Sequence, residues 1–320
     1  GGDLPVSRRA TGRAMKRKRL KRRLERALGA LVPLVAAVAC EPPDRPPALT
    51  AGLPATAVQY VQPDRVSTFL LAEGVTYYAM RSGARPWTLH LVEVDATRCQ
   101  LGFRVVRAGE DEGRAPVSQL AQRSEPGVVA AVNGDFFTPE NLPLGLEISE
   151  GRLRSRTSRS VFAWRPGEPP WVGPVEWRDD AVTIGLWSVS ATAPDRELEV
   201  VAGFPPLLEG GLVVGDLEQR ERPGFAAVRD PRTAVGMDRR RGRVWLVVAE
   251  GRREGAEGMT LPELAGLFQT LGVSEAINLD GGGSSVMVIR REPVSRASDP
   301  TGERAVVNAL VLREDPLYCS

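Results

Sequence analysis

The 320-residue chain has one histidine, His90, and its three lysines all lie within residues 16–21. A zinc site built from several histidines is therefore excluded, and a Ser-His-Asp triad would depend on His90 alone. His90 falls in the alternating stretch WTLHLVEVD, which is typical of a strand, so we interpret it as a strand residue rather than a catalytic one. A Walker loop is excluded because it needs a lysine. Carboxylates, arginines, amides and hydroxyls remain, a set that favours chemistry on sugars or phosphates.

Positive charge is concentrated at the start of the chain. Residues 1–39 contain eleven basic side chains against two acidic ones, whereas the whole chain carries a net charge of +2. Residues 40–320 are therefore acidic on balance, and nothing in them favours a nucleic-acid partner.

Residues 1–39 are expected to be an export leader. A basic stretch, Lys16 to Arg26, precedes the apolar run ALGALVPLVAAVA, which is too short to span a bilayer as a mature helix. The run ends in AVAC, similar to the bacterial lipoprotein cleavage box, although Ala37 stands where that box more often has Leu. Cys40 would then carry the lipid anchor, the only expected contact with a membrane. An ordinary signal peptide cleaved nearby is the alternative. Both interpretations predict export, to the cell envelope or the medium.

The Pro-rich segment 40–57 is expected to be a disordered linker, and residues 58–320 a single domain. In an oxidising compartment Cys99 and Cys319 would be left as a pair that could join the C-terminus to an early strand. Two buried, unpaired thiols are the alternative.

Hydrophobic periodicity predicts a sheet-dominated α+β fold with a few flanking helices. The clearest helix is 260–273, where Thr260 can cap, Pro262 and Glu263 occupy the first turn and Gly272 ends the helix. A shorter helix is predicted near 116–124. The predicted strands and hairpins cover 66–81, 87–95, 99–108, 127–133, 144–155, 232–252, 276–288 and 303–314.

The stretch AINLDGGGSSVMV, residues 276–288, suggests a binding site between two strands. Asp280 comes at the end of the first strand, and three glycines would let the backbone approach a ligand closely. A flexible hairpin turn is the alternative, but three glycines would weaken a simple turn through their conformational entropy.

Two further strands end in polar groups. VNGDFF places Asn133, Gly134 and Asp135 after one buried strand, and Glu250, Gly251 and Arg252 follow another. A planar guanidinium can hold a phosphate through paired hydrogen bonds, so Arg232 and Arg252 are candidate phosphate ligands.

Four motifs of the chain are VNGDFF, PRTAVGM, the segment from EGRREG to GGGSSVMV, and ERAVVNALVL. In order and spacing they resemble the phosphodiester glycosidase family, over roughly residues 90–313. The resemblance implies hydrolysis of the C1–O bond of sugar-1-phosphodiesters. It implies site residues at Asn133, Gly134, Arg232, Thr233, Gly251, Arg252, Asn278, Asp280, Gly281, Gly282, Gly283, Ser284, Ser285 and Asn308. This chain departs from the family pattern at Asp135, where Gly or Ser is common, and at Glu250, where Asp is common.

We therefore predict an exported glycosidase that acts on N-acetylglucosamine-1-phosphodiester-like groups of envelope or extracellular glycans. Asp280 is the expected nucleophile or base and Glu250 the second carboxylate; Asp135 and the other residues of the implied site would bind substrate. No cofactor is expected, although a Ca²⁺ ion near Asp280 and Asp135 is a further hypothesis. The alternatives are a non-catalytic glycan-binding lipoprotein of the same fold, or a glycosidase that acts on exopolysaccharide without phosphate.

Overall fold

The computed structural model describes residues 52–217 and 224–319. All of them belong to one compact unit, Arg45–Ser320, whereas a second unit, Gly1–Asp44, lies outside the described residues, as do residues 45–51 of the expected linker. In the described ranges no helix is long and apolar enough to cross a membrane.

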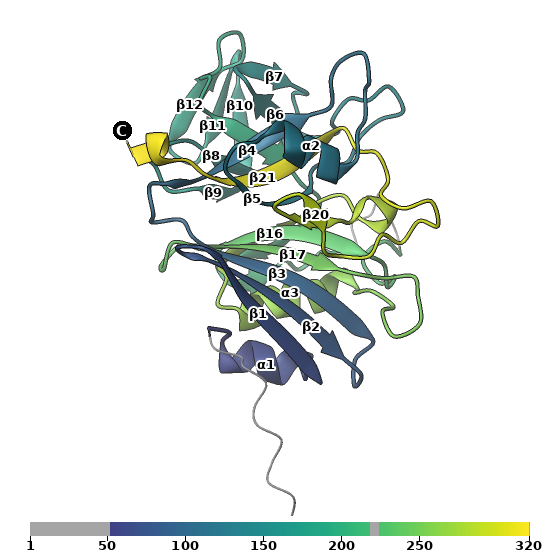
Figure 1. Cartoon of the computed structure of the whole chain (residues 1–320). Helices are drawn as coiled ribbons and strands as arrows, with labels where there is room; N and C mark the ends of the chain where they lie inside the picture. Colours follow the sequence, from purple (N-terminus) through teal and green to yellow (C-terminus); the bar gives the residue numbers. More distant parts are fainter. Residues whose placement is uncertain (1–51, 218–223, 320) are drawn as a thin grey trace, which may run out of the picture. The chain divides into compact units, whose positions relative to one another are not determined.

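The largest sheet has eight antiparallel strands and brings together segments far apart in the sequence (Figure 1). Its order is β1 (Arg65–Ala72), β2 (Val75–Ser82), β3 (Trp87–Asp95), β17 (Arg243–Ala249), β16 (Arg232–Asp238), β18 (Glu275–Asn278), β14 (Pro206–Glu209) and β15 (Leu212–Val213).

A second, five-stranded sheet lies against it. Its order is β20 (Glu292–Pro293), β19 (Met287–Ile289), β5 (Val128–Asn133), β21 (Asn308–Glu314) and β4 (Leu101–Arg107). Two further sheets, one of five strands and one of three, are formed by segments between β5 and β16 in the sequence. The order of the first is β7 (Arg152–Arg154), β6 (Glu147–Ser149), β13 (Glu199–Ala202), β8 (Val161–Trp164) and β9 (Trp171–Gly173). The order of the second is β10 (Val175–Arg178), β11 (Ala181–Ile184) and β12 (Trp187–Ser190).

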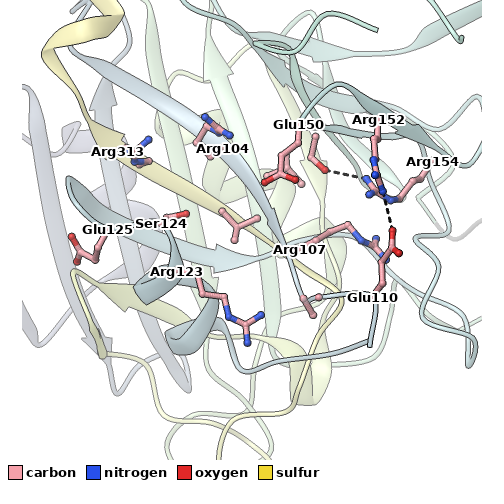
Figure 2. Close-up of a pocket in the computed structure, with 15 residues that line it drawn as sticks. Arg104, Arg107, Glu110, Arg123, Ser124, Glu125, Glu150, Arg152, Arg154 and Arg313 are labelled. Atoms are coloured by element: carbon pink, nitrogen blue, oxygen red, sulfur yellow. Dashed lines mark hydrogen bonds and ion pairs between the residues drawn. The ribbon is translucent and has the colours of Figure 1, made fainter. Parts of the chain in front are cut away.

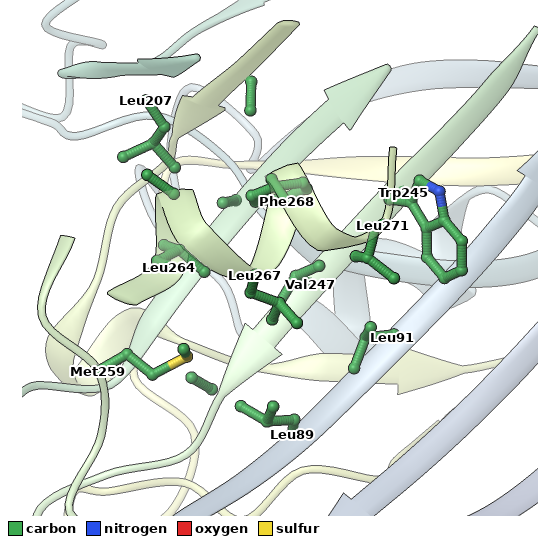
Figure 3. Packing of buried hydrophobic residues seen from close by; sticks show 14 of the residues in the cluster. Leu89, Leu91, Leu207, Trp245, Val247, Met259, Leu264, Leu267, Phe268 and Leu271 are labelled. Carbon is green, nitrogen blue, oxygen red and sulfur yellow. The ribbon is translucent and has the colours of Figure 1, made fainter. Parts of the chain in front are cut away.

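Alternating side chains give the eight-stranded sheet two buried faces. One face packs against α1 (Ala55–Val61) and α3 (Leu261–Thr270). Figure 3 shows Leu264, Leu267 and Phe268 of α3 lying over Trp245 and Val247 of β17. The opposite face packs against the five-stranded sheet, whose far side is covered by α2 (Val117–Arg123). Helices and sheets thus form layers, and the predicted α+β class is confirmed.

The local predictions for α2, α3 and the hairpin β16–β17 are confirmed. Thr260 accepts a hydrogen bond from the Glu263 amide, and the Glu263 side chain accepts one from the Thr260 amide, which forms a capping box at the start of α3. The strands β16 and β17 pair from Arg232 with Ala249 to Asp238 with Arg243.

Helix α1 was not predicted, and it begins inside the segment 40–57 that we expected to be a linker. Leu53, Ala57 and Val61 are buried in the same core as α3, so the folded part includes residues 53–57. At the other end, Cys99 and Cys319 form a disulfide, which decides between the two alternatives that the sequence left open. It joins the short 3₁₀ helix η2 (Pro316–Cys319) to the segment before β4.

Candidate functional site

The ends of β5, β16 and β18 meet where the two large sheets adjoin. The Asp280 amide donates to the Gly134 carbonyl at 3.0 Å, and the Leu279 amide donates to the Thr233 carbonyl at 2.8 Å. These bonds bring the motifs VNGDFF, PRTAVGM and NLDGGGSS together, and their joint role as a site stays a prediction.

Asn133 connects the three strands through its side chain. Its Nδ2 donates to the main-chain oxygen of Asp280 at 2.6 Å. Its Oδ1 accepts from Thr233 Oγ1 at 2.7 Å and from the Val286 amide at 3.3 Å. Asn133 and Thr233 are fully buried. Both buried residues therefore hold the turn at Asp280 in position.

The turn itself begins at Asp280 and continues as the 3₁₀ helix η1 (Gly282–Ser284). The Gly281 amide donates to Asp280 Oδ1 at 2.9 Å, and the Gly282 amide donates to the Pro231 carbonyl at 2.9 Å. These two amides therefore already have acceptors within the protein. Gly282 has a φ of 61°, a left-handed conformation that favours glycine.

Three buried polar atoms around this turn have no hydrogen-bond partner among the described residues: Ser284 Oγ, Ser285 Oγ and Asn278 Oδ1. The other end of the Asn278 amide group donates from Nδ2 to the Phe204 carbonyl at 2.8 Å, which fixes its orientation. Buried polar atoms without partners are uncommon in folded proteins because each costs free energy. A hydroxyl-bearing ligand or ordered water would satisfy them.

Two arginine–aspartate ion pairs pack against the glycines of the turn. Arg252 donates from Nε and Nη2 to the two oxygens of Asp230, at 2.7 and 3.1 Å. Arg304 makes the same kind of paired contact with Asp299, at 2.9 and 3.2 Å. Arg252 was predicted for the site. Arg304 and Asp299 were missed, although the position of Arg304 in the motif ERAVVNALVL could have indicated it.

Arg232 is placed differently from Arg252. It is 1% exposed, and its Nε and Nη2 donate to the carbonyls of Met259, Phe225 and Val228 at 2.8–3.0 Å. Its guanidinium also lies over the Phe225 ring. Burial lowers the pKa of Arg232 to about 10. These contacts hold the segment before β16 in place, and phosphate binding by Arg232 stays a prediction.

Glu250 belongs to a buried hydrogen-bonded chain. Its Oε1 accepts from His90 Nε2 at 2.9 Å and from the Arg296 amide at 2.6 Å, and its Oε2 pairs with Arg253. On the other side of the ring, His90 Nδ1 lies 2.7 Å from the Tyr77 hydroxyl. Burial, together with Arg253, lowers the pKa of His90 to about 4. The ring is therefore neutral at pH 7, and His90 is a strand residue of β3, as the sequence indicated.

Asp135 is buried beside the same turn, and its two oxygens accept from the Phe136 and Gly145 amides at 2.8 and 2.5 Å. Burial raises the pKa of Asp135 to about 7, against the lowering effects of these amides and of Arg159; the charge of Asp280 raises it further. The described residues contain no group of three or more His, Cys, Asp and Glu side chains placed to hold a metal ion. Asp280 is near enough to Asp135 for its charge to affect the Asp135 carboxyl.

Asn308, at the start of β21, supports Asp135. Its Oδ1 accepts from the Asp135 amide at 3.0 Å, and its Nδ2 donates to buried Glu147 at 2.5 Å. A side chain at Gly134 would overlap the Asn308 amide group, and one at Gly251 would lie 2.6 Å from the Pro231 nitrogen. Close packing around the turn therefore leaves no room for a side chain at these two positions.

A large cleft of about 560 Å³ lies away from the glycine turn. Figure 2 shows the arginines that converge on it from several strands and from α2. Each of these arginines faces an acidic side chain within 4.0 Å; they are Arg104, Arg107, Arg123, Arg152, Arg154 and Arg313. Arg107 and Arg154 share Glu147, so the six arginines face five carboxylates. The motifs of the glycine turn do not line this cleft.

Comparison with known proteins decides the family. The family profile described as phosphodiester glycosidase matches residues 126–313. The chain belongs to the phosphodiester glycosidase family. The match spans β5 through β21 and so includes every strand that contributes to the glycine turn.

Two curated members of this phosphodiester glycosidase family carry the name N-acetylglucosamine-1-phosphodiester alpha-N-acetylglucosaminidase. The protein of Bos taurus is 30% identical over 218 residues, which cover 62% of this chain and 38% of that protein. The protein of Mus musculus is 43% identical over 189 residues, which cover 54% of this chain and 34% of that protein. The chain thus spans well under half the length of these relatives.

The fold is also similar to solved structures. The catalytic domain of the zebrafish enzyme of the same name has a TM-score of 0.55 and 22% identity, covering 78% of this chain and 81% of that one. A hypothetical protein from Synechocystis has a TM-score of 0.58 and 18% identity, covering 77% and 63%. At these identities the likeness concerns the fold.

Proposed function

We propose that this phosphodiester glycosidase family member hydrolyses the bond between C1 and the oxygen of a sugar-1-phosphodiester. The observation that carries the proposal is the turn that Asp280 begins after a buried strand. Three buried polar atoms around it have no partner among the described residues, and two exposed arginines pack against its glycines. The polar atoms suit sugar hydroxyls, and the arginines suit a phosphate. The substrate proposed from the names of the relatives is an N-acetylglucosamine-1-phosphodiester of an envelope or extracellular glycan.

The reaction adds water across one bond. The C1–O bond to phosphate breaks, the hydroxyl of water forms the new C1–O bond, and the phosphate leaves as a monoester that takes the remaining proton. A phosphate is already a good leaving group, so stabilising positive charge at C1 is the main task of the protein. Asp280 would act as nucleophile or base, and its Gly281 hydrogen bond keeps Oδ1 in place.

The geometry of the site bears on which residue acts as the second carboxylate. Glu250, which we predicted for this role, already accepts from His90 and Arg296 and pairs with Arg253. Asp135 is the carboxyl whose pKa responds to the charge of Asp280. We therefore propose Asp280 as the reacting carboxylate, with Asp135 beside it, and a supporting role for Glu250.

The test is turnover of an α-N-acetylglucosamine-1-phosphate methyl diester by the wild-type protein and by Asp280→Asn, with and without a chelator. Asn keeps an acceptor for the Gly281 amide, so the variant should fold while turnover falls by about 10²–10⁴-fold. Asp111→Asn is the matched control, because Asp111 is an exposed loop residue. Equal turnover by both variants would contradict the role of Asp280. Loss of turnover with the chelator would indicate the Ca²⁺ ion considered for Asp280 and Asp135.

Two other functions give different outcomes in the same assay. A glycan-binding protein without catalysis would bind the diester and leave it intact. A glycosidase for exopolysaccharide without phosphate would cleave neutral glycosides, and Arg252→Gln would change its rate little.

Export is a separate part of the proposal. It is supported by the basic and apolar stretches before Cys40, and the disulfide between Cys99 and Cys319 fits an oxidising compartment. Mass spectrometry of the N-terminal peptide tests it: a lipid on Cys40 would indicate anchoring, an unmodified N-terminus near Cys40 secretion, and an intact residue 1–39 segment would contradict export.

A further inference from the structure

The two arginine–aspartate pairs are arranged alike around the glycine turn. A Cβ added at Gly282 would lie 2.8 Å from Arg252 Nη2, and one added at Gly283 would overlap Arg304 Nη2. Each guanidinium therefore packs directly against the backbone of one glycine. The arginine side chains are 45% and 44% exposed, whereas the aspartates are 23% exposed. Solvent thus reaches both cations more than it reaches their partners.

We propose that Arg252 and Arg304, each held by its aspartate, form a charge-balanced clamp that binds the phosphodiester group and selects it over a phosphomonoester. The clamp deepens the proposed function, because it names the residues that recognise the phosphate and the charge state they prefer.

The geometry explains how the clamp binds. Each aspartate accepts from Nε and Nη2 of its arginine, which fixes the plane of the guanidinium. The Nη1 group takes no part in the ion pair. A fixed plane loses little conformational entropy when it donates to a phosphate oxygen. The two planes pack against neighbouring glycines of the turn that Asp280 begins, so both can donate to one tetrahedral phosphate bound at this turn.

The charges explain the selectivity. The two arginines and two aspartates have a formal sum of zero, so the clamp offers directed donors without a large net positive charge. A phosphodiester carries one negative charge, whereas a phosphomonoester carries about −1.5 to −2 at pH 7. A clamp without net charge offers the dianion no more donors than it offers the monoanion, whereas taking a dianion out of water costs more free energy. Hydrolysis converts a diester into a monoester, so the same clamp that binds the substrate favours release of the product.

Three hydrogen bonds hold the loop that carries Arg304 in place. The Arg296 amide donates to Glu250 at 2.6 Å, the Met287 amide donates to Ser295 Oγ at 2.7 Å, and the Ser118 amide donates to Glu303 at 3.1 Å. Glu250 is one of these anchors, which gives it a positioning role for the clamp.

Kinetics and binding with four variants test the clamp. Arg304→Gln and Arg252→Gln should each raise KM for the methyl diester roughly ten- to hundredfold, because a charge-assisted hydrogen bond is lost. Asp299→Asn should lower the inhibition constant of methyl phosphate by about three- to tenfold, because a repelling charge is removed. Arg291→Gln is the matched control. Arg291 pairs with Glu125 on the surface, and its loss should change neither constant.

The outcomes separate the clamp from the activity. Dimethyl phosphate and methyl phosphate binding, measured by calorimetry, does not depend on turnover. If the wild-type protein cleaves the diester and Arg304→Gln keeps its KM, the clamp is wrong and the activity stands. If there is no turnover but dimethyl phosphate binding is lost in Arg304→Gln and kept in Arg291→Gln, the clamp stands and the activity does not. Unchanged or weaker methyl phosphate binding by folded Asp299→Asn would overturn the charge-selection part.

Discussion

Asn133 donates a hydrogen bond from Nδ2 to the main-chain oxygen of Asp280 at 2.6 Å, although the two residues are 147 positions apart. Asn133 ends β5 of the five-stranded sheet that contains β21, and Asp280 follows β18 of the eight-stranded sheet. The bond therefore couples the five-stranded sheet to the turn that carries the proposed reacting carboxylate. Thr233 Oγ1 completes the connection by donating to the same side chain. The orientation of Asp280 thus depends on two buried residues that need not touch the substrate.

Thr233→Val tests this coupling. The substitution keeps the shape of the side chain and removes the donor to Asn133 Oδ1, so the free energy of unfolding should fall by about 1 kcal/mol. Turnover should fall several-fold with little change in KM, because Asn133 holds the turn less firmly while the arginines remain. Urea unfolding and steady-state kinetics measure both. Full activity at reduced stability would show that Thr233 contributes only to the fold.

Glu250→Gln distinguishes a supporting residue from a catalytic one. Glutamine removes the charge that faces Arg253 and accepts from His90, and weakening charge-assisted hydrogen bonds of this kind typically costs about 1.5–3 kcal/mol. Turnover per folded molecule should change by less than tenfold, in contrast to Asp280→Asn. Glu257→Gln, at an exposed position, is the control for both measurements. A stable Glu250→Gln protein as inactive as Asp280→Asn would make Glu250 the second catalytic carboxylate.

The state of His90 can be measured directly because it is the only histidine of the chain. Its ring signals should titrate with a pKa of about 4, against about 6.5 for a histidine in an unfolded chain. The folded value is lowered, so the neutral ring contributes stability above pH 6.5 that is lost as the pH falls toward 4. His90→Gln should remove this part of the acid sensitivity. An NMR titration midpoint near 6.5 would contradict a buried, neutral ring.

Local structure was predictable wherever it depends on neighbouring residues. The capping box of α3 and the tip of the hairpin β16–β17 are formed by residues a few positions apart, and their signals are visible in the sequence. Helix α1 was missed because its seven residues have no capping side chain and follow a Pro-rich segment. Only its burial against α3, more than 200 residues later, makes it a helix of the domain.

The candidate site also contains residues that could be predicted from neighbouring sequence and residues whose roles depend on distant contacts. Asp280 and Arg252 could be chosen from motifs, since each follows a buried strand. The role of Glu250 could not, because its partner His90 is 160 positions away and reaches it only through the pairing of β3 with β17. Arg304 was missed for a related reason: the motif ERAVVNALVL contains it, but its contact with the glycine turn depends on how its loop folds back.

Asp135→Ser tests the charge state of the carboxyl beside Asp280. Burial raises the pKa of Asp135 to about 7, far above the value of about 3.9 expected in an unfolded chain. The folded state therefore binds the proton more tightly, and this contribution to stability is complete below pH 4 and is lost as the pH rises through 7. The serine variant should show a shallower fall in the free energy of unfolding between pH 4 and 7.

Serine also occupies this position in the family pattern, so the variant should fold, although the Gly145 amide loses its acceptor. Glu199 shows the same kind of shift, because burial raises its pKa to about 8. Both proteins contain Glu199, and its effect cancels in the difference between them. Chemical unfolding at several pH values gives that difference. If it is independent of pH, Asp135 is ionised throughout the range, and the pair with Asp280 would then consist of two charged carboxylates.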